Sequence, residues 1–435
     1  MKWSKFNIKI PFDNDRTILF NTLSRNIVLV QNKALQTIKE SMDKANINAN
    51  YLDDMSQLKS LNFIIPDPID ENSRFVYLMS MHKFNSSSIS IFISLSSECN
   101  FRCVYCYQDA DNAKNNAYMN EKNWKILFNY IDYRRKLSGL KSIALILFGG
   151  EPMMNDELVK KIIKDVGTFK KAGCTISIAL ITNGSLLTPD KIDEIGQFLN
   201  TIQFTIDGNE ESHDELRLFS NGAGSYKIVL ENFLYAVKKI PGKVVLRCNV
   251  SNTNKKNIIA LLRLLASFRL QNLIREVDFR AIYSSQREIT QCGRETKITV
   301  DTATELAEIF LEASKLGFEV SRSFVVGPCS GTMSNSFAVD ENLNVYVCPG
   351  FLYLNPDGKI DKNGKLSISN SRWYKMCIKT KPCVYECKYG PICYGGCRWM
   401  EGTSTKCNKE IFEATLPPML KAYVLSKIMR GLDVR

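Results

Sequence analysis

Three cysteines lie close together in the first quarter of the chain, in the segment Cys99-Asn-Phe-Arg-Cys103-Val-Tyr-Cys106. The C-x3-C-x2-C spacing directly follows a predicted strand. Three thiolates on one short loop can bind three irons of a 4Fe-4S cluster, which leaves the fourth iron without a protein ligand. An open iron can bind a small molecule and pass an electron to it. The alternatives are a zinc site, which normally takes four ligands, and three unligated thiols.

A second group of cysteines follows residue 320. Fourteen cysteines in an apparently cytosolic chain indicate metal binding, because reducing compartments keep thiols free of disulfides. Eight of them would suffice for two fully ligated clusters, with two zinc ions as the alternative. These eight are Cys329, Cys348, Cys377, Cys383, Cys387, Cys393, Cys397 and Cys407. The isolated cysteines are expected to be buried structural thiols, namely Cys174, Cys248 and Cys292.

Composition indicates an ordinary globular protein. Hydrophobic residues make up 45% and charged residues 23%, and no apolar run is long enough to cross a bilayer. The N-terminal MKWSKFNIKI lacks an apolar signal segment, so we expect a cytoplasmic protein with no membrane partner. The net charge of +12 permits an acidic partner such as a nucleic acid or an acidic peptide. The lysines are scattered, however, which favours a plain solvated surface and no nucleic-acid partner.

The middle of the chain, residues 86–320, alternates short β-rich runs with amphipathic stretches. This pattern predicts an α/β fold with a parallel sheet, open or curved into a partial barrel, and such sheets gather their chemistry at the carboxyl ends of the strands. The expected strands are residues 88–95, 142–148, 175–181, 201–206, 243–250 and 276–282. The expected helices are residues 120–137, 156–172, 188–199, 225–239 and 254–268.

The two ends differ from the middle. Residues 1–85 predict a small α+β module, with strands near 18–20, 27–30 and 63–66 and helices near 31–43 and 51–60. It suits either a winged-helix-like peptide-binding element or an ordinary N-terminal subdomain. Residues 321–415 are rich in Gly, Pro, Asn and Cys, as expected where metal clusters replace a hydrophobic core. Residues 416–435 are expected to form a closing helix, from Leu416 to Leu432.

The cysteine loop resembles the signature of the radical S-adenosylmethionine (SAM) superfamily, C-x3-C-x-aromatic-C, with Tyr105 as the aromatic residue. The resemblance implies a partial (β/α)6 TIM-like barrel. It further implies that Cys99, Cys103 and Cys106 hold the 4Fe-4S cluster that cleaves SAM to a 5'-deoxyadenosyl radical, and that Tyr105 lies beside the adenine.

Further segments resemble SAM-contacting motifs of the same superfamily. They are the GGEP segment after the second strand, the TNG segment after the third, and a T-x-D-G segment followed by HD-x-x-R after the fourth. Ordinary turn chemistry is the alternative for Asn183 and Asp207, and a structural ion pair is the alternative for Arg217. The implied cofactor-binding residues are Tyr105, Gly149, Gly150, Glu151, Pro152, Asn183, Thr205, Asp207 and Arg217.

The later cysteines resemble the SPASM domain, a C-terminal extension of radical SAM enzymes that carries two auxiliary 4Fe-4S clusters. Two departures stand out, because Cys383-x3-Cys387 replaces the usual C-x2-C and Leu343 stands where the family usually has glycine. By this resemblance one cluster takes Cys329, Cys348 and Cys397. The other takes Cys383, Cys387, Cys393 and Cys407. Cys377 could complete the first cluster, or that iron could be open to a substrate thiolate.

Enzymes of this architecture mainly modify ribosomally made peptides, or oxidise Cys or Ser to formylglycine in sulfatases. Sulfatase maturases typically carry Asp after the cysteine that corresponds to Cys348, where this chain has Pro349. We therefore expect an oxidoreductase-type peptide (RiPP) maturase that forms a thioether or C–C crosslink, or epimerises a residue. Its expected partners are a precursor peptide, whose leader would bind residues 1–85, and a reductant such as flavodoxin or ferredoxin. An anaerobic sulfatase-maturating enzyme and a non-enzymatic electron carrier are the alternatives.

Overall fold

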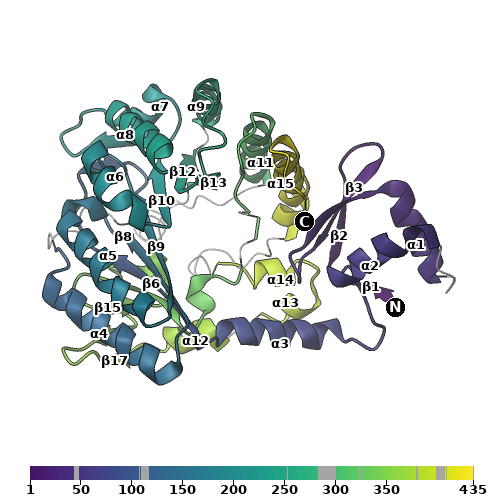
Figure 1. Cartoon of the computed structure of the whole chain (residues 1–435), viewed down its shortest axis with the longest axis horizontal. Helices are drawn as coiled ribbons and strands as arrows, with labels where there is room; N and C mark the ends of the chain where they lie inside the picture. The colour runs from purple at the N-terminus through teal and green to yellow at the C-terminus, as the bar shows by residue number, and fades with distance from the viewer. Residues whose placement is uncertain are drawn as a thin grey trace.

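A single large sheet organises the molecule (Figure 1). The computed structural model describes residues 1–43, 49–106, 108, 117–251, 253–282, 300–322, 324–325, 327–378, 381–397, 407 and 409–434. Cys292 lies outside these residues, so its expected burial stays a prediction. Within the described residues, no helix is both long enough and apolar enough to cross a membrane.

The central sheet contains the six strands that the alternating pattern predicts, and their order is β13-β12-β10-β9-β8-β6. All neighbouring pairs among them are parallel. The strands are β6 (Ser88–Ser94), β8 (Ser142–Phe148), β9 (Thr175–Thr182), β10 (Thr201–Thr205), β12 (Val244–Val250) and β13 (Glu276–Ala281). The α/β fold with a central parallel sheet is thus confirmed.

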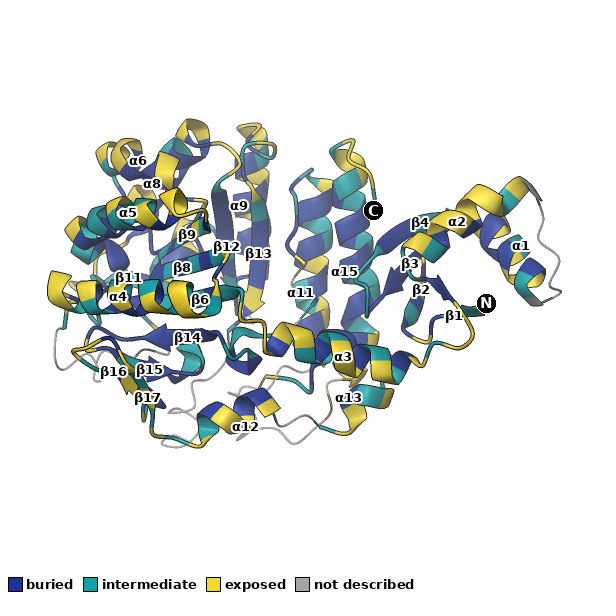
Figure 2. Cartoon of the chain, turned by 60° about the horizontal axis from the view of Figure 1, so that its bottom comes forward, coloured by how far each residue is buried: buried dark blue, intermediate teal, exposed yellow. Residues whose placement is uncertain are grey.

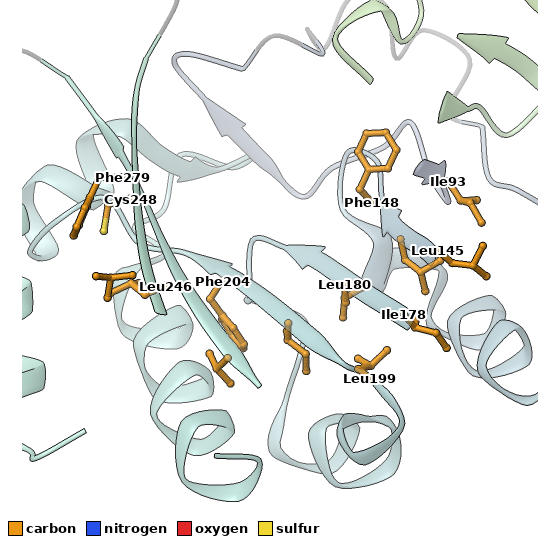
Figure 3. Packing of buried hydrophobic residues seen from close by; sticks show 14 of the residues in the cluster. Ile93, Leu145, Phe148, Ile178, Leu180, Leu199, Phe204, Leu246, Cys248 and Phe279 are labelled. Atoms are coloured by element: carbon orange, nitrogen blue, oxygen red, sulfur yellow. The ribbon is translucent and has the colours of Figure 1, made fainter. Parts of the chain in front are cut away.

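Helices cover one face of this sheet because every second side chain of a strand points toward them. Along β6, for example, Ile89, Ile91 and Ile93 are at most 2% exposed, while the residues between them are partly exposed. Figure 3 shows such side chains packed between the strands and the helices. The covering helices are α4 (Glu121–Ser138), α5 (Asp156–Lys171), α6 (Pro189–Ile195), α8 (Tyr226–Lys239) and α9 (Lys255–Ser267).

The cysteine-rich region extends this sheet. Strand β14 (Ser336–Val339) pairs in parallel with β6, and β15 (Asn344–Tyr346), β16 (Gly358–Ile360) and β17 (Leu366–Ile368) follow as antiparallel neighbours. The sequence did not predict these strands, because runs of three or four residues are too short for an alternating pattern to stand out. The backbone of Leu343 in the turn between β14 and β15 has a φ of +65°, a conformation that favours glycine.

The N-terminal module is a three-stranded antiparallel sheet, in the order β2-β3-β4, with two helices on one face. Leu19 and Val28 pack with the helices in a small core, whereas Ile18 and Phe20 face the main core. A second helix pair, α11 (Val300–Lys315) and α15 (Lys409–Met429), packs between the module and the central sheet (Figures 1 and 2). The elements of the module are β1 (Lys2–Trp3), β2 (Asn7–Pro11), β3 (Arg16–Asn21), β4 (Ile27–Gln31), α1 (Asn32–Asp43), α2 (Leu52–Ser60) and β5 (Ile64–Ile65).

Three further helices connect these parts. Helix α3 (Glu71–Lys83) leads from the module to β6, and α11 (Val300–Lys315) packs against the closing helix α15 (Lys409–Met429). Helix α15 begins seven residues before the expected Leu416 and contains Pro417 and Pro418. Proline removes a backbone donor but keeps a helical φ, and buried Phe412 and Leu416, one turn apart, anchor the first turns.

Candidate active site

A short strand pair holds the cysteine loop. After β6, the loop enters β7 (Phe101–Cys103), which pairs antiparallel with β11 (Arg217–Phe219) and places Cys103 opposite Arg217. Beyond β7, the backbone N–H of Cys106 donates to the carbonyl of Cys103 at 3.1 Å, which turns the chain back on itself. The three thiols therefore sit on one tight loop at the carboxyl end of β6.

The thiols lie near enough to influence one another. Burial, followed by the carboxylate of Glu151 and the thiols of Cys103 and Cys106, raises the pKa of Cys99 to about 12. Burial likewise raises the pKa of Cys103. Three thiolates packed in this way need a positively charged partner. Among the described residues, no three side chains of Cys, His, Asp or Glu converge as ligands of a single metal ion would, whereas a cubane binds each thiolate at a different iron.

Two glycines let the end of β8 pass against this loop. A Cβ on Gly149, whose φ is +143°, would lie 2.4 Å from the carbonyl oxygen of Ser96, and a Cβ on Gly150 would lie 2.1 Å from that of Glu98. These distances are shorter than any real contact of this kind. The backbone N–H of Gly150 donates to the carbonyl of Ser96 at 2.8 Å. The glycine pair therefore supports the backbone that leads into Cys99.

Glu151 ties neighbouring strand ends together. Its buried carboxylate accepts hydrogen bonds from the hydroxyl of Thr182 at 2.7 Å, the N–H of Asn183 at 2.7 Å and the N–H of Met153 at 3.0 Å. Burial raises the pKa of Glu151, and these hydrogen bonds oppose the rise. Pro152, also buried, opens the short helical turn Pro152–Asn155. Glu151 thus holds the carboxyl end of β9 against that of β8.

Asn183, at the end of β9, reaches the cysteine loop. Its side-chain amide donates to the side-chain oxygen of Asn100 at 2.8 Å and lies 3.8 Å from the sulfur of Cys99. Asn100 was not among the residues that the sequence singled out, and its only signal was its place directly after Cys99. Thr205, the last residue of β10, is buried at the same edge of the sheet.

Tyr105 lies at the centre of a buried polar cluster. Its hydroxyl donates to Asp207, and it accepts from Arg217 at 2.7 Å and from the side-chain amide of Asn249 at 2.9 Å. Burial raises the pKa of Asp207, while Arg217 and Tyr105 oppose the rise. The backbone N–H of Asn249 also donates to Asp207 at 2.7 Å. The cluster therefore joins the cysteine loop to the ends of β10 and β12.

His213 contacts the backbone of Asp207 and so stabilises this cluster. Its Nδ1 accepts from the N–H of Asp207 at 3.2 Å, and its Nε2 lies 3.0 Å from the hydroxyl of Ser225. Burial, together with the nearby Arg217, holds the pKa of His213 far below its usual value. The imidazole is therefore neutral and keeps the turn after β10 in place.

The later cysteines form two sets. Burial, together with the thiols of Cys329 and Cys397, raises the pKa of Cys348 to about 12. Burial also raises the pKa of Cys393, and the thiols of Cys407 and Cys387 add to the rise. The assignment of these cysteines to two auxiliary clusters stays a prediction of the SPASM resemblance.

Apart from the cysteine loop, four described cysteines lie outside the groupings that these pKa shifts indicate. Cys383 is exposed at the start of α13 (Cys383–Glu386), on the same short segment as Cys387. Cys377 is buried on α12 (Arg372–Ile378), where burial raises its pKa and Lys83 opposes the rise. Cys174 and Cys248 are buried in the main core, as the sequence predicts for structural thiols.

A buried carboxyl connects the β14–β15 turn with the start of the cysteine loop. Glu341, only 2% exposed, accepts hydrogen bonds from the hydroxyl of Ser94 and, at 2.7 Å, from that of Tyr353. Burial raises its pKa to about 7, against the effect of these two hydrogen bonds. Ser94 ends β6, and a Cβ on Gly149 would lie 2.9 Å from its hydroxyl oxygen.

The family model described as the Radical SAM superfamily matches residues 93–265, which contain the cysteine loop, the glycine pair and the Tyr105 cluster. This segment is a radical SAM domain. Its membership agrees with the resemblance that the cysteine spacing suggested.

Curated relatives of the radical SAM domain have diverse names. An uncharacterized protein of Methanocaldococcus jannaschii is 29% identical over 183 residues, which cover 42% of this chain and 60% of that protein. A cysteine-type anaerobic sulfatase-maturating enzyme of Clostridium novyi is 26% identical over 176 residues, covering 39% of this chain and 45% of the enzyme. A radical SAM cyclopropyl synthase of Paramaledivibacter caminithermalis is 22% identical, covering 33% of this chain and 31% of the synthase. The chain spans less than two thirds of each relative.

The fold also resembles solved structures beyond the radical SAM domain. The structure of anSMEcpe with bound AdoMet superimposes with a TM-score of 0.61 at 18% identity, over 78% of this chain and 99% of that one. The same protein with bound AdoMet and a peptide gives a TM-score of 0.60 at 16% identity, over 78% of this chain and 99% of that one. At these identities the likeness shows a shared fold.

The residues of the radical SAM domain fit a 4Fe-4S cluster and SAM. The three thiols share one loop, and the thiols of Cys103 and Cys106 raise the pKa of Cys99. The Nε of Arg217 is buried beside them and has no hydrogen-bond partner among the described residues, so it can donate to a carboxylate such as that of SAM. The two glycines let the end of β8 pack directly against the backbone that leads into Cys99.

Proposed function

We propose that this chain is a peptide maturase that crosslinks a ribosomally made precursor through a thioether or C–C bond. The observation that carries the proposal is a free sheet edge in the N-terminal module. Strand β4 ends the β2-β3-β4 sheet, and no described strand pairs with its outer edge. Half of the backbone donors and acceptors of such an edge strand face away from the sheet, where an extended peptide can pair with them.

A cavity of about 440 Å³ runs along this edge. Residues Val28–Gln31 of β4 line it, together with residues of α2 and with Leu432–Val434 near the end of the chain. A cavity beside an unpaired strand offers backbone pairing and side-chain pockets at once, which is how proteins capture extended peptides. We assign this place to the leader of the precursor.

Within the radical SAM domain, Cys99, Cys103 and Cys106 would hold the cluster, and Arg217 would orient the carboxylate of SAM through its unpaired Nε. The bound cluster and SAM would supply a 5'-deoxyadenosyl radical that abstracts hydrogen from a substrate carbon. Tyr105 would form one wall of the pocket, held in place by Asp207 and Asn249. The two later cysteine sets would hold auxiliary clusters that accept an electron from the product radical.

The residue after Cys348 favours crosslinking over formylglycine formation. Pro349 opens the short helical turn Pro349–Phe351, and the sulfur of Cys348 accepts the N–H of Gly350 at 3.4 Å. Proline offers no carboxylate that could take a proton from a substrate thiol or hydroxyl. The similarity to a sulfatase-maturating enzyme in sequence, and to anSMEcpe in fold, keeps sulfatase maturation as the second candidate.

The test is an anaerobic assay of the reconstituted full chain with SAM, a chemical reductant and a cysteine-containing precursor peptide encoded nearby. Crosslinking predicts deoxyadenosine and a peptide lighter by two hydrogens, detected by mass spectrometry. A product of unchanged mass with an inverted residue would indicate epimerisation. Conversion of a sulfatase-derived peptide to formylglycine would support the second candidate instead.

Matched variants separate an enzyme from an electron carrier. Cys103→Ala should abolish deoxyadenosine formation, because it removes one ligand of the SAM-binding cluster. Cys174→Ala, which alters a buried thiol in the main core, should retain it. If Cys103→Ala kept full activity, the chain would not be a SAM-cleaving enzyme.

A further inference from the structure

The cavity along β4 differs in charge from the chain as a whole. The chain carries a net charge of +12, yet the charged residues that line the β4 cavity are Asp54 and Asp433. Gln31 also lines a second cavity, which continues past the end of β4. The charged residues there are Asp13, Asp15, Arg16 and Lys33.

Local pairing leaves this second cavity close to neutral. Arg16 forms an ion pair with Asp13 at 2.6 Å, so Asp15 and Lys33 remain as one acidic and one basic side chain. Of the two cavities, the β4 cavity is therefore the acidic one. At physiological ionic strength, charges more than about 8 Å apart are largely screened. A bound peptide would thus respond to the nearby carboxylates more than to the distant positive charges of the chain.

The remaining lining is apolar and follows the strand period. Val28 and Val30 stand two residues apart on β4 and face the same side, toward Leu58 of α2. Leu432 and Val434 close the cavity from the end of the chain. A peptide strand beside β4 would present alternate side chains to this apolar surface, because successive side chains of a strand point to opposite faces.

We propose that the β4 cavity binds an extended peptide segment with alternate apolar residues and a Lys or Arg that lies beside the exposed carboxylate of Asp54. This inference rests on the proposed function, in which a precursor peptide is the substrate, and it gives the chemistry of the recognised segment. It differs from the acidic partner that the net charge of +12 permits.

The test is a binding measurement by fluorescence anisotropy, with the full chain at physiological salt and short labelled peptides as probes. One peptide alternates valine and lysine, and its twin alternates valine and glutamate. We expect the lysine peptide to bind at least about fivefold more tightly, because opposite charges meet in a partly enclosed cavity. A third probe, the lysine peptide with alternate backbone nitrogens methylated, should lose binding because it cannot add a strand.

Neighbouring aspartates provide a matched control. Asp53 and Asp54 are both exposed on the first turn of α2, but only Asp54 lines the cavity. Asp54→Lys should remove or reverse the preference for the lysine peptide, and Asp53→Lys should keep it. The two variants should melt at closely similar temperatures, because each replaces an exposed acidic side chain in the same first turn of α2.

Three results would overturn the inference. They are equal binding of the two charged peptides, tighter binding of the glutamate peptide, and equal effects of Asp53→Lys and Asp54→Lys. The peptide-modification assay fails or succeeds separately, because it measures deoxyadenosine and product mass. A preference for the lysine peptide in the binding measurement, without any modified product in the peptide-modification assay, would support this binding site and contradict the proposed reaction.

Discussion

At the scale of single residues, the site depends on buried polar groups that satisfy one another. Tyr105 is the clearest case, because its one hydroxyl serves Asp207, Arg217 and Asn249 together. Removing one member of such a cluster leaves the others buried without partners, which costs more than the hydrogen bond itself contributes.

Tyr105→Phe should therefore lower the free energy of unfolding by about 1–3 kcal/mol, since Asp207 and Arg217 lose a shared partner. It should also weaken SAM binding, because the ring would lose its anchoring. Chemical denaturation and equilibrium dialysis with labelled SAM measure the two effects. The control is Tyr133→Phe, at a residue 58% exposed, which should change neither quantity.

Glu341 makes stability depend on pH. Its pKa is about 7 in the folded chain and 4.5 for the free group, so the folded chain binds more protons between these values. The contribution of Glu341 to the free energy of unfolding is fully present below pH 4.5 and is lost as the pH rises to 7. Glu341→Gln removes the titration. Relative to the variant, the parent chain should lose about 3 kcal/mol across this range.

Urea denaturation at several pH values measures this difference. The groups that act on Glu341 are Ser94, Tyr353 and Asp340, and none of them is changed in the variant. The same substitution at Glu157, whose side chain is 82% exposed, should give no comparable pH dependence. Parallel stability curves for the parent and Glu341→Gln would show that the carboxyl is already ionised when buried.

At the scale of elements, the β14–β15 turn has a strained position. Leu343 has a φ of +65°, which costs a side-chain-bearing residue roughly 1–2 kcal/mol relative to glycine. Its side chain is only 3% exposed, and burying a leucine contributes about 1.5–3 kcal/mol. The packing of Leu343 therefore offsets the strain, which explains how leucine can stand where the SPASM resemblance leads one to expect glycine.

Two substitutions separate the backbone strain at Leu343 from the packing of its side chain. Leu343→Ala keeps the strained backbone and loses the packing, whereas Leu343→Gly loses the packing but relieves the strain. The glycine variant should be the more stable of the two by about 1 kcal/mol, although alanine normally exceeds glycine in stability. Thermal denaturation of both variants is the measurement. A more stable alanine variant would mean that the turn relaxes to an ordinary φ.

The sequence predicted the long strands of the central sheet well, but it missed the short strands and the helices α3 and α11. The six strands from β6 to β13 carry enough alternating apolar residues to be recognised, and their ends lie within one or two residues of the expected ones. Strands β14–β17 have three or four residues each and went unnoticed. Contacts across the fold were also unpredictable, since Asn100 and Glu341 owe their positions to partners far away in the sequence.

At the scale of the whole molecule, three groups of thiols share one connected body. The radical SAM domain and the cysteine-rich region are joined by the parallel pairing of β6 with β14. The module contacts the same region, where the hydroxyl of Thr22 donates to the carbonyl of Lys388 at 2.6 Å. The two later cysteine sets lie outside the cysteine loop, so clusters bound there should survive removal of the ligands in the loop.

Three cubanes correspond to about twelve irons per chain. The triple variant Cys99→Ala, Cys103→Ala, Cys106→Ala should keep about eight irons, because the two later sets lie outside the loop. Iron analysis of anaerobically reconstituted protein measures the content, and Cys174→Ala should keep all of it. A triple variant with about four irons or fewer would mean that the later cysteines hold at most one cluster.

The ladder from β6 to β14 has a consequence for any substrate. Hydrogen-bonded parallel strands form no hinge, and the module rests on the region that they support (Figure 1). If a peptide is bound at β4 and modified beside the cysteine loop, the distance between the two sites is fixed by the fold. The length of tether between the gripped segment and the altered residue then becomes a property that a precursor must match, so that residues inserted into that tether would move the modification along the peptide.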